Sequence, residues 1–234
     1  MKPIYKRMVL KLSGEALAGN QKHGICIDTV TKICKSIKKC SDAGVEIGIV
    51  VGGGNYWRGR DTAINDRIRA DHIGMLATMM NALAVSDVLE SLGCEVRVQS
   101  AISMVEFAEP CVRQKACNHL SKGKIVIFGA GTGNPGFSTD SAAALRAKEL
   151  NADIMLKATM VDGVYDKDPL KFDDAIMYET MKFRDILVGN LRVLDGTAAA
   201  MCIDNSIPII VFNLHDPENI YRAVVGEKIG TIVN

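Results

Sequence analysis

Two lysines in this chain stand inside apolar runs, where they could serve chemistry. Lys11 interrupts Arg7-Met-Val-Leu-Lys-Leu12, and Lys157 directly follows Ala152-Asp-Ile-Met-Leu156. Both runs have the character of buried strands, in which an unpaired charge is costly. A solvated lysine is the ordinary alternative, but the cost of burial favours a functional role. Two ammonium groups from different strands could stabilise charge on a phosphoryl group during its transfer.

Three glycine-bearing stretches follow strand-like runs, as phosphate-binding loops do. They are Ser13-Gly14, Gly52-Gly-Gly54 and the segment from Gly129 to Thr139, which opens onto a helix. Glycine lets the backbone approach a ligand closely, and helix N-termini favour anions. Because the carboxyl ends of parallel strands lie along one sheet edge, we expect these loops to meet there with the two lysines. With Arg58 beside the triple glycine, the pattern predicts a site for more than one phosphate.

Two common nucleotide motifs are absent. The chain has no G-x-x-x-x-G-K-[ST] segment, which excludes a Walker-type NTPase. Gly129-Ala-Gly-Thr-Gly133 resembles a dinucleotide-binding turn, but the third glycine of that motif would fall on Asn134. The 129–139 segment therefore indicates an anion site of another kind.

Several aspartates are candidates with simpler explanations beside them. Asp140 and Asp195 stand where helices are expected to begin, so each could act only as an N-cap. Asp71 lies inside a long helical stretch, where an exposed aspartate is ordinary. Asp168 belongs to a segment dense in turn formers and could be a turn residue.

Hydrophobic periodicity predicts an α/β fold. Expected strands cover 7–12, 45–51, 95–99, 125–128, 152–156, 208–212 and 231–233, and expected helices cover 27–43, 64–92, 111–122, 140–150, 179–189, 195–205 and 217–226. Continuous apolar strands separated by helices favour a mainly parallel sheet covered on both faces. A soft division into two lobes is expected near residue 150.

Composition bounds the class of protein. The chain has 234 residues, a formal net charge of +1 and 48% hydrophobic residues, which is typical of a globular protein and argues against a dedicated nucleic-acid binder. Its seven cysteines show no C-x-x-C spacing, so we expect buried thiols in a reducing compartment.

The N-terminus lacks a signal-peptide core, and no apolar run reaches the roughly 18 residues of a membrane span. These features predict a cytoplasmic protein.

The motifs together resemble the bacterial-type uridylate kinases, a branch of the amino acid kinase superfamily. The resemblance covers nearly the whole chain. It rests on Lys11-Leu-Ser-Gly-Glu15, Gly52-Gly-Gly-Asn55 with Arg58, Asp71-His-Ile-Gly-Met-Leu-Ala-Thr78, Gly131-Thr-Gly-Asn-Pro135 with Phe137 to Ser141, Leu156-Lys-Ala-Thr159, Val161-Asp-Gly-Val-Tyr165 and Gly226-Glu-Lys. The Asp71–Thr78 and Thr132–Pro135 segments are the most specific for this branch.

The resemblance implies a three-layer α/β/α sandwich around a mainly parallel central sheet. It implies one amino-acid-kinase domain over 1–234, with an acceptor-side N-terminal part and a nucleotide-side C-terminal part. The implied reaction transfers the γ-phosphoryl group of ATP to UMP, giving UDP and ADP in pyrimidine biosynthesis. Mg²⁺ would be held through the ATP phosphates, with no protein metal ligand. Members of this branch are typically homohexamers, activated by GTP and inhibited by UTP.

Site residues follow from the same resemblance. The residues implied in ATP binding are Lys11, Leu12, Ser13, Gly14, Gly54, Arg58, Thr159, Tyr165 and Asp168. Those implied in UMP binding are Gly53, Asp71, Thr132, Gly133, Asn134, Pro135, Gly136, Phe137, Ser138 and Thr139. We assign catalysis to Lys11, Lys157, Asp140 and Asp195. An acceptor phosphate with a second pKa near 6 is already mostly dianionic at pH 7, so no general base is required, and the aspartates would orient the lysines or Mg²⁺-bound water.

One position departs from the family pattern, and two other functions remain open. Gly136 stands where relatives commonly carry an aromatic residue, while the neighbouring Phe137 is retained. Another acid-phosphorylating kinase, acting on glutamate, acetylglutamate, aspartate or carbamate, would share the donor motifs but not the 129–139 loop. A nucleotide-binding sensor without turnover would share the binding motifs but would not need both lysines.

Overall fold

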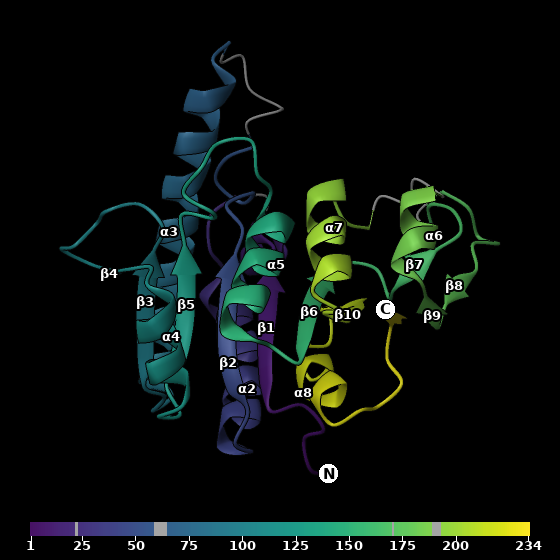
Figure 1. The fold of residues 1–234 in the computed structure, drawn as a ribbon, viewed down its shortest axis with the longest axis horizontal. Helices are drawn as coiled ribbons and strands as arrows, with labels where there is room; N and C mark the ends of the chain where they lie inside the picture. The colour runs from purple at the N-terminus through teal and green to yellow at the C-terminus, as the bar shows by residue number, and fades with distance from the viewer. Residues whose placement is uncertain (22, 59–64, 170, 189–192) are drawn as a thin grey trace.

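A mainly parallel sheet forms the centre of the fold (Figure 1). The computed structural model describes residues 1–21, 23–58, 65–169, 171–188 and 193–234. In that part of the chain, the strands of the main sheet are β1 (Arg7–Leu12), β2 (Glu46–Val51), β3 (Val96–Ser100), β4 (Glu109–Pro110), β5 (Ile125–Gly129), β6 (Ile154–Thr159), β9 (Thr180–Met181), β10 (Ile209–Asn213) and β11 (Thr231–Val233). Their order is β4-β3-β5-β2-β1-β6-β10-β11-β9, and β10 and β11 run antiparallel. A separate antiparallel pair joins β7 (Val164–Tyr165) to β8 (Met177–Tyr178).

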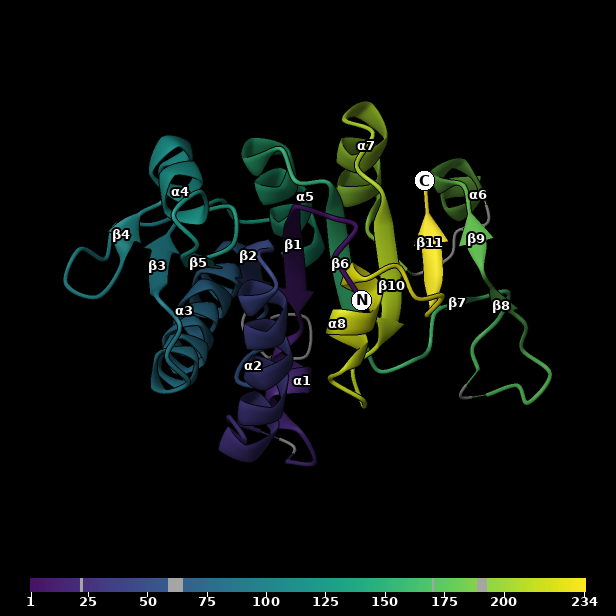
Figure 2. The ribbon, with the colours of Figure 1, turned by 90° about the horizontal axis from the view of Figure 1, so that it is seen from below.

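Helices cover both faces of the sheet, as Figure 2 shows from below. One face carries α1 (Gly14–Ala18), α2 (Ile27–Asp42), α3 (Arg67–Ser91) and α8 (Asn219–Val224). The other face carries α4 (Arg113–Leu120), α5 (Thr139–Leu150), α6 (Phe183–Val188) and α7 (Gly196–Asp204). Separate hydrophobic clusters fill the two layers. The predicted three-layer α/β/α fold is confirmed.

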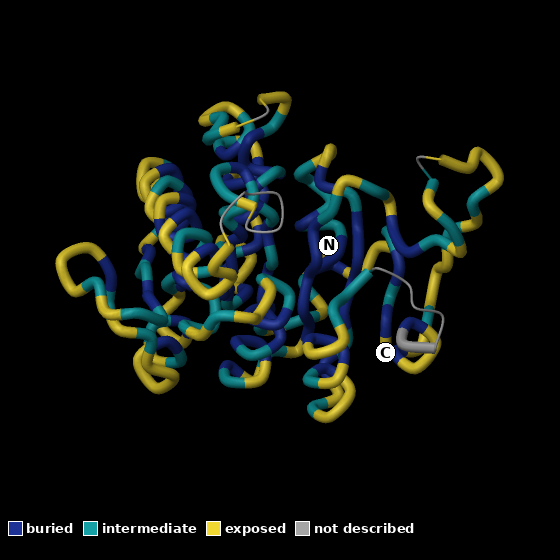
Figure 3. The backbone as a smooth tube through the Cα atoms, turned by 90° about the horizontal axis from the view of Figure 1, so that it is seen from above, coloured by how far each residue is buried: buried dark blue, intermediate teal, exposed yellow. Residues whose placement is uncertain are grey.

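The period of two along β1 decides which way its side chains point. Met8, Leu10 and Leu12 pack into the cluster under α2 and α8, whereas Val9 packs under α5. Lys11 shares the parity of Val9 and therefore faces α5. The central strands are buried along most of their length, and the exposed segments lie around them (Figure 3).

The longest helix, α3, is also markedly apolar. Among the described residues it is the one helix whose length and composition would suffice to cross a membrane, and 56% of its most apolar window is buried inside the fold. Ala82, Val85 and Leu89 of α3 belong to the core cluster. Packing against the sheet therefore accounts for much of this apolar content.

Some element boundaries differ from the predicted ones. The helix expected over 179–189 is wrong in its first part, because Thr180–Met181 pairs with β11 as strand β9. α3 begins only at Arg67, where the Asp66 side chain accepts bonds from two backbone N–H groups of the first turn. Residues 64 and 189, at the ends of those expected helices, lie outside the described residues. The short elements α1, β4, β7 and β8 were not predicted.

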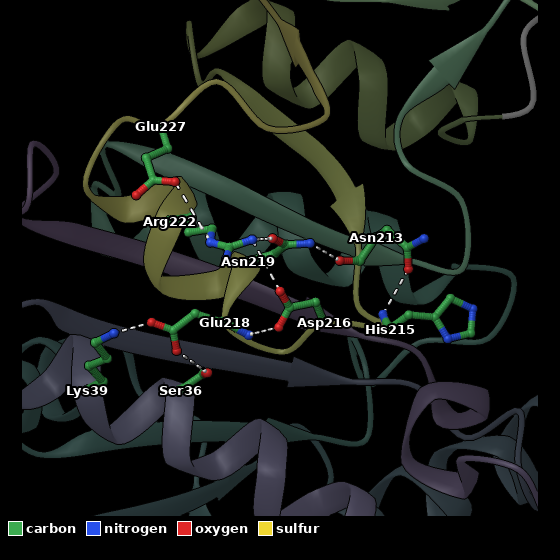
Figure 4. A network of polar contacts seen from close by, with 9 residues as sticks. All are labelled: Ser36, Lys39, Asn213, His215, Asp216, Glu218, Asn219, Arg222 and Glu227. Atoms are coloured by element: carbon green, nitrogen blue, oxygen red, sulfur yellow. Dashed lines mark hydrogen bonds and ion pairs between the residues drawn. The ribbon is translucent and has the colours of Figure 1, made fainter.

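A polar network fastens α8 to the rest of the fold (Figure 4). Glu218, just before α8, pairs with Lys39 of α2. Asn219 donates to the carbonyl of Asn213 at the end of β10, at 2.9 Å. The Asn213 amide in turn donates to Asp162 at 2.8 Å. This network therefore connects α2 with the segment that follows β6.

Candidate active site

The centre of the candidate site is a carboxylate between two ammonium groups. Lys11 and Lys157 lie side by side on the paired strands β1 and β6. Asp140, in the first turn of α5, places one oxygen 3.0 Å from Lys11 Nζ and bonds Lys157 Nζ with the other. The three side chains are only 10–14% exposed. The predicted meeting of the two lysines at one sheet edge is confirmed.

Burial and charge act on these groups in opposite directions. Burial disfavours ionisation of Asp140, but the positive charges of Lys11 and Lys157 outweigh it and hold the pKa of this carboxyl below its usual value. For Lys157, burial lowers the pKa of the ammonium group, although Asp140 opposes the shift. The triad has one more positive than negative charge, and it lies at the sheet edge where anions would bind.

Asp195 is the N-cap of a helix, as its simpler explanation predicted, and it also bonds the first turn of α5. It caps α7 by accepting from Ala198 N at 2.9 Å. Its oxygens also accept from the hydroxyls of Ser138 and Ser141, the latter at 2.9 Å. Ser138 is the N-cap of α5. Asp195 therefore holds the helix that carries Asp140.

A cleft of about 480 Å³ opens beside Lys11 and Asp140, and we call it the glycine cleft. It lies over the carboxyl ends of β1, β2 and β5, which are neighbours in the sheet. The glycine-bearing loops expected to converge do so here. Its lining includes Lys11, Ser13, Gly14, Gly52, Gly53, Gly54, Arg58, Asp71, Gly131, Thr132, Asn134, Phe137, Ser138, Thr139 and Asp140.

Gly14 and Gly53 pack too closely against neighbouring backbone atoms to carry side chains. A Cβ on Gly14 would lie 2.5 Å from Gly54 N, and one on Gly53 would lie 2.8 Å from Gly74 O. Two fully buried amides hold this loop: Asn81 of α3 donates to Gly52 O at 2.6 Å and exchanges bonds with Asn55. The glycines are thus required by close backbone approach on the wall of the cleft.

The 129–139 loop reaches across the cleft to α3. Asp71 Oδ2 accepts from Gly136 N at 2.7 Å. Gly136 has a φ of 85°, a left-handed conformation that an aromatic residue would adopt only with strain. Gly136 therefore permits a loop conformation that differs from one built around an aromatic residue. Phe137 beside it is 50% exposed and lines the cleft.

A second hollow of about 430 Å³ opens on the other side of the lysine pair, and we call it the valine hollow. It is lined by Lys157, Thr159, Val161, Gly163, Val164, Tyr165, Lys167, Asp168, Pro169, Val193 and Val211. Its walls combine an apolar surface with a few polar groups, which is the usual make-up of a site for a flat organic ring.

The predicted ATP residues divide between the two cavities. Ser13, Gly14, Gly54 and Arg58 line the glycine cleft, while Thr159, Tyr165 and Asp168 line the valine hollow. The Leu12 side chain lies in the core, and only its carbonyl reaches the loop, accepting from Gly52 N. Arg58 pairs with Glu15 at 2.6 Å.

The predicted UMP residues gather on one side. Gly53, Asp71, Thr132, Asn134, Phe137, Ser138 and Thr139 line the glycine cleft, whereas Gly133, Pro135 and Gly136 belong to its loop without lining it.

No cage of protein ligands for a metal ion is found in the described ranges, where no three His, Cys, Asp or Glu side chains are grouped to hold one. Each carboxylate that lines the cleft already has a partner: Asp140 pairs with two lysines, Glu15 pairs with Arg58, and Asp71 accepts from Gly136 N. The residues present therefore fit a metal held by substrate phosphates, as Mg²⁺ commonly is, and do not fit a protein-ligated ion.

Sequence reasoning missed four buried polar residues that shape these cavities. Thr78 and Asn81 of α3, Arg146 of α5 and Thr231 of β11 are each at most 8% exposed. Thr78 and Asn81 lie seven and ten residues after Asp71, so all three fall on one face of α3. A polar stripe on a helix with a buried face was the available signal.

Comparisons with known proteins agree with this geometry. The sequence profile of the amino acid kinase family matches residues 6–213. The UMP kinase of Bacillus anthracis is 39% identical with a TM-score of 0.95, over 98% of this chain and 96% of that one. The UMP kinase of Ureaplasma parvum is 37% identical with a TM-score of 0.91 over the full length of both chains. The uridylate kinase of Archaeoglobus fulgidus is 28% identical with a TM-score of 0.75, over 97% of this chain and 99% of that one.

Proposed function

The chain belongs to the amino acid kinase family and, within it, to the UMP kinases, and we propose that it transfers the γ-phosphoryl group of ATP to UMP, giving UDP and ADP. The observation that carries the proposal is the placement of Lys11, Lys157 and Asp140 between two cavities of different chemistry. A donor and an acceptor bound in these cavities would meet at the lysines.

In the proposed mechanism, the valine hollow takes the adenine end of ATP and the glycine cleft takes UMP. Thr159, Tyr165 and Asp168 act on the base side of ATP, and Ser13, Gly14, Gly54 and Arg58 act on its phosphates. Gly53, Asp71 and the loop from Thr132 to Thr139 bind UMP. We propose one domain in which the part before residue 150 binds UMP and the ATP phosphates, and the part after it binds the base side of ATP.

In this mechanism Lys11 and Lys157 stabilise the transition state electrostatically. Negative charge spreads over the transferring phosphoryl oxygens, and Lys11 and Lys157 stabilise it from two strands. Asp140 holds both ammonium groups in place, and Asp195 acts through α5 as a positioning residue. The acceptor phosphate is itself the nucleophile, so no side chain has to remove a proton.

Mg²⁺, bound through the ATP phosphates, would neutralise further charge on them. Cytoplasmic placement is part of the same proposal. It is supported by seven unpaired cysteine thiols, which suit a reducing compartment.

The test is a coupled assay of ADP release with UMP, CMP, glutamate, acetylglutamate, aspartate and carbamate as acceptors. We expect turnover with UMP well above that with every other acceptor. Turnover on one of the acids without turnover on UMP would replace the proposal with another acid kinase. ATP binding without turnover on any acceptor would favour a sensor.

Self-association is the second part of the proposal, and the outer face of α3 supports it. Ile68, Leu76, Met80 and Leu83 are 37–59% exposed and form a stripe along this face. Arginines stand at the first turn of α3 and acidic residues at its end, namely Arg67, Arg69, Asp87 and Glu90. Antiparallel pairing of two copies would set Leu76 against Met80 and basic ends against acidic ends.

We propose that such pairs assemble further into a hexamer, with activation by GTP and inhibition by UTP. Light scattering on Met80→Glu tests the pairing: a smaller assembly is expected, with Ile176→Glu as the control at an exposed apolar position outside α3. An unchanged mass for Met80→Glu would contradict the pairing. Assays with added GTP or UTP test the regulation.

A further inference from the structure

Ala130 adopts a backbone conformation that its side chain disfavours. It follows β5 directly, has a φ of 59° and is fully buried. Asn151 and Ser206 share a positive φ, but each follows a helix, where the left-handed conformation is an ordinary ending. A residue with a Cβ keeps this conformation only where its surroundings enforce it, and such strain concentrates at functional sites.

Thr78 holds Ala130 from the side of α3. Its hydroxyl accepts from Ala130 N at 2.8 Å and donates to Met75 O at 2.7 Å. The threonine is 7% exposed. The hydroxyl therefore ties the Ala130 N–H to α3 at the wall of the glycine cleft, which Thr78 also lines.

Arg146 holds the next residue from the side of α5. It donates to Gly131 O at 3.3 Å and pairs with Glu149 at 2.5 Å. Its guanidinium stands 5.5 Å from the centre of the Phe128 ring. Arg146 is 5% exposed, and its Nε has no hydrogen-bond partner. A buried cation therefore contacts the loop at Gly131.

We propose that Thr78 and Arg146 clamp Ala130–Gly131 and so set the conformation of the 129–139 loop that binds the acceptor. They are positioning residues for acceptor affinity and do not act in phosphoryl transfer. The inference rests on the proposed function and adds to it the device that fixes the acceptor site. Gly131 and Thr132 line the glycine cleft, and Asp140, which holds the two lysines, lies on the same helix as Arg146. The clamp therefore fixes the position of the acceptor loop relative to the lysines.

The test measures KM for UMP, KM for ATP and kcat in Thr78→Val and Arg146→Lys. Valine keeps the shape of Thr78 without its hydroxyl, and lysine keeps the charge of Arg146 without the planar fork. We expect KM for UMP to rise roughly 3- to 10-fold in each, as for loss of a hydrogen bond. KM for ATP and kcat should stay within about 2-fold of the unmodified values. Arg113→Lys is the matched control, because Arg113 donates to the backbone at Glu149 but does not reach the loop.

Rescue separates the clamp from a general effect on packing. Glycine adopts a positive φ without strain. Adding Ala130→Gly to Thr78→Val should therefore recover part of the lost affinity for UMP, which calorimetry of UMP binding also reports without turnover. Equal increases in both KM values, or no rescue, would overturn the clamp. If Thr78→Val does not fold, the same readouts on Arg146→Lys, alone and with Ala130→Gly, decide. Absence of UMP turnover in the unmodified chain would instead contradict the proposed function.

Discussion

The glycine cleft and the valine hollow lie on either side of one lysine pair, yet they are built from different materials. The glycine cleft has walls of backbone and charged side chains, with Lys11, Arg58 and Asp71 among them. The valine hollow has walls of valine, glycine and proline with Tyr165, to which Thr159, Lys167 and Asp168 add polar groups. Backbone and charge suit phosphates and hydroxyls, whereas apolar walls suit a ring.

The two cavities nevertheless fasten their loops in the same way. Thr78 accepts from Ala130 N at 2.8 Å beside the glycine cleft, and Thr231 accepts from Val164 N at 2.8 Å beside the valine hollow. Each hydroxyl also donates to a carbonyl, and each threonine is buried. In each cavity a buried hydroxyl therefore holds a backbone N–H of the loop, although Thr78 itself lines the glycine cleft and Thr231 is not part of the lining of the valine hollow.

The largest effect is expected at the lysine pair that both cavities share, where a substitution should lower kcat. Lys11→Ala removes a cation that stabilises the transferring group in the proposed mechanism, and loss of one such group lowers kcat by roughly 10²–10³-fold. KM for UMP should change far less. Initial-rate kinetics measure both quantities, with Lys122→Ala, at an exposed lysine, as the control. An unchanged kcat in Lys11→Ala would remove this residue from the chemistry.

Asp140→Asn tests whether the ion pairs of Asp140 with Lys11 and Lys157 also stabilise the fold. The change leaves two buried ammonium groups without their carboxylate, and breaking a buried pair lowers the free energy of unfolding by about 3–5 kcal/mol. Urea denaturation at pH 7 measures this loss. Asp42→Asn, which breaks an exposed pair with Lys38, should cost less than about 1 kcal/mol.

The same variant has a predicted pH dependence. Because the pKa of Asp140 is lowered in the folded state, its contribution is present above the unfolded carboxyl pKa of about 3.9 and is lost as pH falls through the folded value. The difference in unfolding free energy between the unmodified chain and Asp140→Asn should therefore narrow as the pH falls below about 4. A difference that stays constant down to the lowest pH at which the chain folds would contradict this account.

Much of the fold could be predicted, because the local signals agree with the tertiary structure. Apolar runs ending in glycine predicted β1, β2 and β5 and the edge at which their loops meet. Lys11 and Lys157 could be singled out because a charge within a buried strand needs a partner. The sequence did not say that the partner of both would be Asp140, since the pairing depends on how α5 lies over β1 and β6.

The failures share a physical cause, which is contact between distant segments. Thr180–Met181 looks helical locally, but pairing with β11 makes it a strand. For Asp195 the alternative role of helix N-cap is observed at α7, but its bonds to the serines of α5 could not be predicted, because Ser141 is 54 residues away in the chain. Thr231 was missed because the N–H that it holds is 67 residues away in the chain.

The smallest expected effects give the most direct test of the division between the two cavities. Steady-state kinetics on Thr78→Val and Thr231→Val compare two isosteric losses of a buried hydroxyl. We predict that Thr78→Val raises KM for UMP roughly 3- to 10-fold and leaves KM for ATP near its unmodified value, and that Thr231→Val does the reverse. If either variant raises both KM values equally, or if the two effects are exchanged, the assignment of acceptor to the glycine cleft and donor to the valine hollow is wrong.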